Sequence, residues 1–205
     1  MTSAQGRVPY PEAARTLLRD TIVAAVDDLV RSRGWSATTM SHVAAAAGVS
    51  RQTVYNEFGS RRALVEAYVL REIETLIAGV EDAVRASCGD AHSAMQAAFG
   101  LFLKLASDEP LVQVIVADAE GGELIRLLTG LGRQVATDRI GRLIVAVWPQ
   151  VSVADADLLA ESMARLAISH ALLPTSDPED TAAAVTRMIG PFIDEILGVR
   201  ASTRP

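Results

Sequence analysis

Cysteine, histidine and lysine are scarce in this chain of 205 residues, which narrows the kinds of site that it can build. Its single cysteine, Cys88, cannot form an internal disulfide or a thiolate metal cluster. The three histidines, His42, His92 and His170, lie far apart in the sequence and show no metal-ligand spacing. Lys104 is the only lysine. We therefore expect no metal ion, no cofactor and no catalytic residue.

Long apolar runs are also missing. The longest, such as residues 143–147, are far shorter than the roughly 20 residues needed to span a bilayer. The first 20 residues include Pro9, Pro11 and Glu12 but no apolar segment typical of a secretory signal. With the single cysteine, which agrees with a reducing compartment, these absences predict a cytoplasmic protein that does not enter a membrane.

Negative charge is in excess overall but is unevenly distributed, with a formal net charge of −6. Residues 1–71 contain nine arginines and six acidic residues, a net +3. Residues 72–205 contain ten basic and 19 acidic residues, a net −9. A basic N-terminal segment followed by an acidic remainder suggests that the N-terminal segment binds a polyanion, because the local electrostatic field steers binding. Ordinary scatter could produce the same excess, so charge alone does not decide.

Helical periodicity dominates the sequence, since apolar residues recur every three or four positions and no run alternates with period two. Half of the residues are hydrophobic, enough to bury a full core. We predict an all-α protein of about nine helices. The predicted helices cover 12–33, 39–47, 50–57, a long segment from 60, 90–107, 110–117, 121–148, 154–173 and 178–197.

The segment from 40 to 62 has the local features of a helix-turn-helix. Ala44 is small where a second helix must cross, and Gly48 permits a sharp turn. Ser50 can cap the second helix, and Val54 would face the core. This arrangement leaves a row of polar side chains outside, suited to phosphate oxygens and base edges. The row consists of Arg51, Gln52, Thr53, Tyr55 and Asn56.

An alanine-rich hairpin whose charges simply face water is the alternative. Residues 31–62 contain five arginines and only one carboxylate, Glu57. This imbalance, together with the joint occurrence of the small residue, the glycine, the cap and the apolar anchor, favours DNA binding.

A set of spaced residues surrounds this segment: Gly34-Trp35, Thr38-Thr39, Val43-Ala44, Gly48-Val49-Ser50, Tyr55, Phe58, Ser60, Arg61 and Leu64. By these residues, the segment 15–70 resembles the N-terminal DNA-binding domain of TetR-family transcriptional regulators. The remaining helical body resembles the effector-binding and dimerisation domain of that family in length and pattern. We therefore predict an N-terminal helix-turn-helix domain at 1–59 and a C-terminal helical domain at 60–205, linked by the fourth helix.

The resemblance also implies which residues contact DNA. Glu57 stands where many relatives carry histidine or another polar residue. A carboxylate there would repel phosphate, so we expect Glu57 to pair with an arginine or to accept from a cytosine amino group. The implied phosphate contacts are Thr39, Ser41, Tyr55 and Arg61. The implied base contacts are Arg51, Gln52, Thr53 and Asn56.

Large apolar side chains between about 90 and 170 predict the lining of an effector pocket, although ordinary core is the alternative for each. An apolar lining favours a hydrophobic effector such as a lipid, an acyl chain or an aromatic compound. The candidate lining residues are Met95, Phe99, Phe102, Leu103, Ile115 and Trp148, with Leu128 and Ile144 beside them.

Apolar stripes on the last two predicted helices suggest a partner surface, because one stripe serves the monomer core and the other is available. A two-fold homodimer is also what the family implies, and a palindromic operator requires it. The candidate interface residues are Met163, Ala167, His170, Ile189 and Phe192.

The sequence thus predicts a DNA-binding transcriptional regulator, a repressor that a small, largely apolar effector releases from a palindromic operator. A helical protein-interaction scaffold and an enzyme without a recognisable catalytic motif are the alternatives. Neither of these would show a steep salt dependence of DNA binding.

Overall fold

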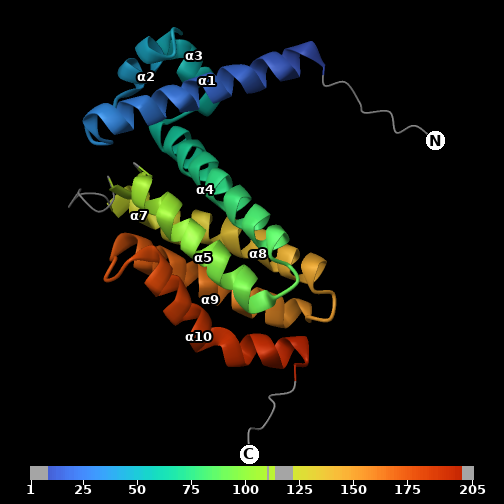
Figure 1. Ribbon diagram of the computed structural model, residues 1–205. Helices are drawn as coiled ribbons and strands as arrows, with labels where there is room; N and C mark the ends of the chain where they lie inside the picture. The colour runs from blue at the N-terminus through green and yellow to red at the C-terminus, as the bar shows by residue number, and fades with distance from the viewer. Residues whose placement is uncertain (1–8, 110, 114–121, 200–205) are drawn as a thin grey trace, which may run out of the picture. The chain divides into compact units, whose positions relative to one another are not determined.

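A computed structural model describes residues 9–109, 111–113 and 122–199 (Figure 1). Within these ranges the regular structure consists of nine α-helices, a helical segment at 111–113 and one π-helical turn, which confirms the predicted all-α fold. None of the described helices is both long enough and apolar enough to cross a bilayer.

Short connections join the helices wherever the linking residues are described. The first four are α1 (Tyr10–Arg33), α2 (Met40–Ala46), α3 (Arg51–Phe58) and α4 (Arg61–Ala86). The others are α5 (Ala91–Asp108), α7 (Gly122–Leu127), α8 (Arg133–Val147), α9 (Val153–Leu172) and α10 (Pro178–Leu197). The π-helical turn η1 (Leu128–Gly132) joins α7 to α8, so the helix predicted at 121–148 contains an irregularity that its apolar spacing did not indicate. Of the helix predicted at 110–117, residues 111–113 are helical and the rest lies outside the described ranges.

Two compact units divide the chain, Met1–Tyr68 and Val69–Pro205. The boundary predicted from the sequence, between 59 and 60, falls earlier, at the start of α4. The difference arises because the first turns of α4 pack into the first unit: Leu64 and Val65 are buried, and the buried Tyr68 donates a hydrogen bond to Asp27 on α1 at 3.2 Å. One continuous helix therefore contributes to both units.

The first unit has a small core, in which α2 packs against both α1 and α3 (Figure 1). Ile22, Val26 and Val30, at a spacing of four on α1, are almost fully buried. Val43 of α2 and Val54 of α3 are equally inaccessible. This apolar spacing explains why each of the three segments presents one face to the core and leaves the other face to solvent.

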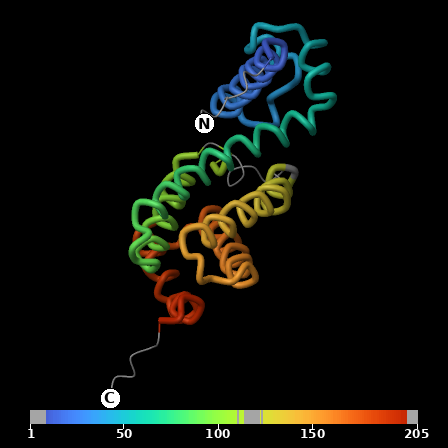
Figure 2. Tube along the Cα trace, turned by 90° about the vertical axis from the view of Figure 1, so that its right-hand side faces the viewer, coloured from blue at the N-terminus to red at the C-terminus, as the bar shows by residue number. Residues whose placement is uncertain are grey.

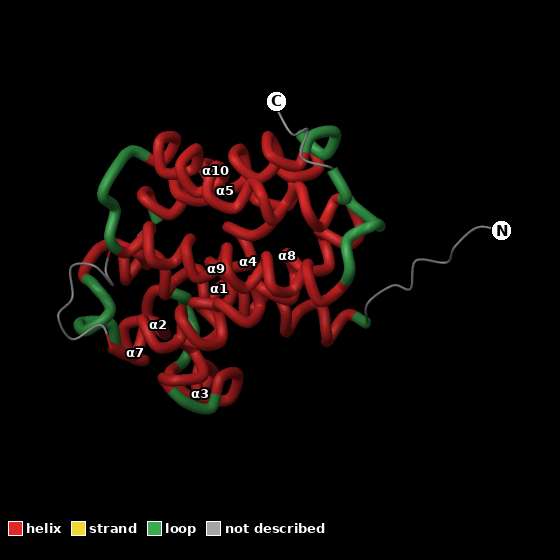
Figure 3. The backbone as a smooth tube through the Cα atoms, turned by 90° about the horizontal axis from the view of Figure 1, so that it is seen from below, coloured by secondary structure: helices red, strands yellow, loops and turns green. Residues whose placement is uncertain are grey.

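In the second unit α8 packs against α9, α10 packs against α5, and α5 also contacts α9 (Figure 3). Figure 2 shows α8 and α9 running side by side, in yellow and orange. Small residues allow α5 and α10 to approach closely: a Cβ at Gly100 would lie 3.4 Å from Ala182, and a Cβ at Gly190 would lie 3.0 Å from His92. The core of this unit includes Phe99, Leu103, Ile144, Leu159, Met163 and Ile193.

Candidate nucleic-acid interface and ligand cavity

The turn between α2 and α3 has the geometry of a helix-turn-helix. Gly48 adopts a φ of 67°, in the left-handed region that glycine enters at low cost. The amide of Val49 donates to the carbonyl of Ala44 at 2.9 Å, and Ser50 Oγ accepts from the amide of Thr53 at 3.0 Å. The predicted turn and cap are therefore confirmed. They fix the direction in which α3 leaves the turn.

Three polar side chains of α3 are exposed, those of Arg51, Gln52 and Asn56. Gln52 Nε2 donates to Asn56 Oδ1 at 2.8 Å, one helical turn away. Arg51 Nη2 donates to the half-buried Tyr55 hydroxyl at 3.4 Å, and the Arg51 guanidinium lies 5.3 Å from the centre of the Tyr55 ring. The exposed face of α3 thus consists of side chains already ordered in pairs.

Thr53 differs from its neighbours, since it is half-buried and its hydroxyl lies 2.8 Å from Ser50 Oγ. Its polar atom therefore belongs to the cap of α3. At the start of α2, Thr39 and Ser41 are exposed, and Thr39 Oγ1 accepts from the amide of His42 at 3.3 Å. These two hydroxyls lie where a helix N-terminus favours an anion.

Arg61 is part of the first unit's packing as well as a predicted phosphate contact. Its guanidinium lies 3.8 Å from the centre of the Trp35 ring, and Nη2 donates to the carbonyl oxygen of Trp35 at 3.2 Å. The adjacent Arg62 is exposed and pairs with Glu66 at 3.0 Å. Arg61 therefore ties the start of α4 to the segment before α2.

Glu57 joins α3 to α1. Its carboxylate accepts a hydrogen bond from Arg15 Nε at 2.9 Å and lies 3.7 Å from Arg19 Nη1. Arg19 also donates to the carbonyl oxygen of Glu57 and lies over the Phe58 ring at 4.3 Å. The hydrogen bond and the charge of Glu57 raise the pKa of Arg15. Of the two roles expected for Glu57, pairing with an arginine is the one that the structure shows.

A cavity of about 130 Å³ lies within the second unit, between α4, α5, α8 and α9. Four of the six residues predicted for an effector pocket line it: Met95, Phe99, Phe102 and Trp148. Leu103, the fifth, is buried in the adjacent core instead, because it lies one position further around α5 than Phe102. Ile115 lies outside the described residues.

The contributions of α4 and α9 to this cavity were not predicted from the sequence. The apolar spacing of α4 marks a buried face, but spacing alone does not reveal whether that face meets solid core or a cavity. Leu128 and Ile144, named beside the six candidates, also line it. The lining residues that were not foreseen include Ile73, Leu76, Ile77, Val80, Leu143, Ala164 and Ile168.

Arg133 is the single charged side chain among the described residues that line the cavity. Its Nη1 donates to Glu161 on α9, and its Nε donates to the carbonyl oxygen of Thr129 at 3.1 Å. Hydrogen bonds from Arg165 above all, then from Arg133 and Thr137, lower the pKa of Glu161, which favours the charged carboxylate. With Arg133 engaged in this way, the cavity offers a ligand mainly apolar contacts.

The residues predicted for a dimer interface face inward or lie at the edge of the core. Met163 and Ala167 are buried and line the cavity. His170 is half-buried, with its ring 6.3 Å from that of Phe99 in an edge-on arrangement. Ile189 and Phe192 are half-buried against the same core. The apolar side chains that α9 and α10 leave most open are others, among them Leu158 at 55% and Met188 at 61% exposure.

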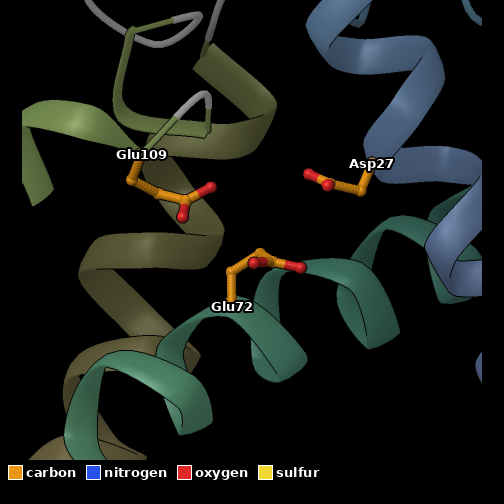
Figure 4. Close-up of side chains that lie close together, drawn as sticks. All are labelled: Asp27, Glu72 and Glu109. Atoms are coloured by element: carbon orange, nitrogen blue, oxygen red, sulfur yellow. The ribbon is translucent and has the colours of Figure 1, made fainter. Parts of the chain in front are cut away.

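Two carboxylates of the second unit lie close together, Glu72 on α4 and Glu109 just after α5 (Figure 4). Their oxygen atoms are within 4.8 Å of one another. Glu72 accepts hydrogen bonds from Arg71 Nε at 3.0 Å and Nη2 at 2.9 Å. Asp27, drawn in the same figure, belongs to the first unit. Because a guanidinium already neutralises Glu72, the pair is a salt-bridged acidic group rather than an evident cation site.

Known proteins resemble this chain over most of its length. Residues 22–68 match the family described as "Bacterial regulatory proteins, tetR family", and residues 90–191 match "Bacterial Tetracyclin repressor, C-terminal domain". The HTH-type transcriptional regulator AlkX of Mycobacterium tuberculosis (strain ATCC 25618 / H37Rv) is 37% identical over 191 residues, covering 92% of this chain and 90% of that protein.

Solved structures of TetR family proteins also match this chain. The TetR family repressor AlkX from Dietzia sp. strain DQ12-45-1b, implicated in biodegradation of n-alkanes, has a TM-score of 0.76 at 34% identity. The match covers 87% of this chain and 96% of that one. Thermus thermophilus FadR, a TetR family repressor solved with lauroyl-CoA, shares the fold with a TM-score of 0.59 at 20% identity, covering 91% of this chain and 98% of that one.

Proposed function

The chain belongs to the TetR family of DNA-binding transcriptional regulators, and from this premise we propose that it is a repressor released from a palindromic operator by a small, largely apolar effector. The matched relatives are regulators, which confirms that the chain is not an enzyme. A regulator of this kind meets its operator in the cytoplasm.

The observation that carries the proposal is the exposed face of α3. Arg51, Gln52 and Asn56 are exposed to solvent. The helix is held in place by the N-cap at Ser50 and by the hydrogen bond from Arg15 to Glu57. The one carboxylate of α3, that of Glu57, forms an ion pair with Arg15, so it does not repel phosphate. A rigid helix with exposed donors is what the major groove requires.

The effector is proposed to carry an alkyl chain. The cavity lining supports this assignment, because each methylene group buried there contributes about 0.8 kcal/mol and few polar groups are available to orient a polar ligand. The Dietzia relative, which is implicated in the biodegradation of n-alkanes, points to the same chemistry.

We propose that α4 transmits the effect of the ligand from the cavity to the DNA-binding unit. Its residues Leu64 and Tyr68 are buried in the first unit, and Ile73 and Ile77 line the cavity of the second. A ligand that displaces Ile73 or Ile77 acts directly on the helix that also forms part of the DNA-binding unit. By linkage, a ligand that weakens operator binding 100-fold supplies about 2.7 kcal/mol and must itself bind 100-fold less tightly to the DNA complex.

A palindromic operator requires two recognition helices, which we propose come from a homodimer formed through α9 and α10. The predicted interface residues Met163 and Ala167 instead line the cavity inside the same chain. Leu158 on α9 and Met188 on α10 are the better contacts, because they are apolar and open in the single chain.

Two measurements test this function. The first records where the protein binds on genomic DNA and how the affinity for the recovered sites falls with salt; a steep fall is expected, and an absent one would favour a scaffold. The second titrates the protein with dodecane and with dodecanoate, with and without the recovered operator present. Release of the operator is expected. Equal ligand affinity in both conditions would remove an alkyl ligand as the control signal.

A further inference from the structure

Two side-chain amides of α3 form a hydrogen-bonded pair in which Gln52 is the donor. Gln52 and Asn56 are both exposed, lie one turn apart, and are joined by a hydrogen bond of 2.8 Å from Gln52 Nε2 to Asn56 Oδ1. Asn56 therefore uses its acceptor oxygen on Gln52. Gln52 uses one of its two amide hydrogens on Asn56 and keeps the other, together with its whole acceptor oxygen.

The groups that Gln52 retains are one acceptor and one donor on the same side-chain amide. In the major groove, adenine presents the complementary set, the N6 amino donor beside the N7 acceptor, and glutamine can bind both. Guanine presents two acceptors there, which would leave the Gln52 oxygen without a partner. An unpaired polar atom at a desolvated contact is costly.

Other side chains of α3 are less suited to this role. Thr53 is engaged with the cap residue Ser50, and Glu57 is held by Arg15. Arg51 has only donors and pairs with Tyr55, so it suits guanine or phosphate rather than adenine. Asn56 keeps both amide hydrogens and one lone pair, but its oxygen already accepts from Gln52, and its side chain is one methylene shorter and reaches less far toward a base.

We propose that Gln52 specifies an adenine in each operator half-site and that Asn56 is a positioning residue that holds the Gln52 amide in the orientation for adenine. This inference rests on the proposed function, since it assigns a base to a reading residue of that function. Preorganisation is the physical reason for the pair, because a long side chain held before binding loses less conformational freedom in the complex.

Selection of bound duplexes from a random pool tests the proposal with the full-length protein and three variants. For the parent protein, one position of each half-site should be adenine, preferred roughly 5- to 150-fold over other bases. Gln52→Glu should change that position to cytosine, because a carboxylate accepts from the cytosine amino group and cannot donate to adenine N7. A selected position that stays adenine in Gln52→Glu, or that is never adenine, overturns the assignment.

The two Asn56 variants separate positioning from folding. Asn56→Ala should reduce the adenine preference at the position that Gln52 reads. Asn56→Asp retains an acceptor oxygen for Gln52, so it should restore this preference even though its charge weakens binding to every duplex. Asn56→Ala with an unaltered preference overturns the positioning role. A parent protein that enriches no motif overturns both this inference and the proposed function, whereas an enriched motif that is insensitive to Gln52 overturns the inference alone.

Discussion

At the scale of single residues, the turn before α3 depends on the backbone freedom of Gly48. Its φ is 67°, and no atom lies within 4 Å of the place where a Cβ would stand. The cost of Gly48→Ala is therefore backbone strain alone, and we expect the free energy of unfolding to fall by about 1–2 kcal/mol. Gly89→Ala is the matched control, because Gly89 has the same open space without a positive φ. Equal losses in denaturant unfolding would contradict this account.

A second prediction at this scale concerns acid sensitivity. Hydrogen bonds from Arg165 above all, then from Arg133 and Thr137, lower the pKa of Glu161 from its ordinary 4.5. Because the folded pKa is lower than the unfolded one, the contribution to stability is complete above pH 4.5 and is lost as the pH falls through the folded value. As the pH is lowered below 4.5, the melting temperature of Glu161→Gln should therefore fall less than that of the parent protein. Glu74→Gln, on an exposed part of α4, should follow the parent.

At the scale of elements, Gly132 of η1 lies against Ile73 of α4. A Cβ there would lie 2.2 Å from Ile73 Cδ1, so Gly132→Ala must displace a buried side chain. Because Cδ1 is the free end of a side chain that borders the cavity, it can move aside, and we expect a loss of about 1 kcal/mol, the lower end of the range for overpacking. Ile73→Val removes the clashing atom and should recover most of that loss in the double variant, although it costs about 0.5–1.5 kcal/mol alone. Strict additivity in a double-mutant cycle would show that the two residues do not meet.

Arg61 connects two elements and is also predicted to contact DNA. Arg61→Ala should lower stability, because its guanidinium lies over Trp35, and should weaken all duplexes while reducing the salt slope by about one unit. Arg62→Ala provides the comparison, since Arg62 is exposed and pairs only locally, with Glu66 four residues away. An unchanged salt slope with reduced stability would leave Arg61 a structural residue.

At the scale of the whole molecule, the proposed palindromic operator requires association of two chains. Met188 is 61% exposed on α10, so Met188→Glu should leave the fold of one chain intact. At a dimer interface, the same unpaired charge would be costly to bury. We expect monomers in sedimentation, an unchanged helical signal and loss of operator binding. A charge at Ala167 is less informative, because that residue is buried beside the cavity and unfolding would mask association. Persistent dimers of Met188→Glu would exclude this face.

Much of this protein is determined by sequence alone, because the signals involved are local. The cap at Ser50 and the turn at Gly48 act within a few residues, and each is present where the sequence predicts it. Apolar spacing likewise predicts the helices and the buried face of each. The all-α fold and the family follow from these features without knowledge of tertiary contacts.

The tertiary structure decided which faces meet. Spacing marks Met163 and Ala167 as apolar, but only packing shows that they border the chain's own cavity rather than a free surface. The sequence leaves Glu57 two possible partners, and the structure pairs it with Arg15, 42 positions away. From the sequence, Leu103 and Phe102 are equally good candidates for the pocket lining. In the structure, the orientation of α5 places Phe102 at the cavity and Leu103 in the core. These choices lie beyond the sequence because they depend on how distant helices pack, and many packings satisfy the same local pattern.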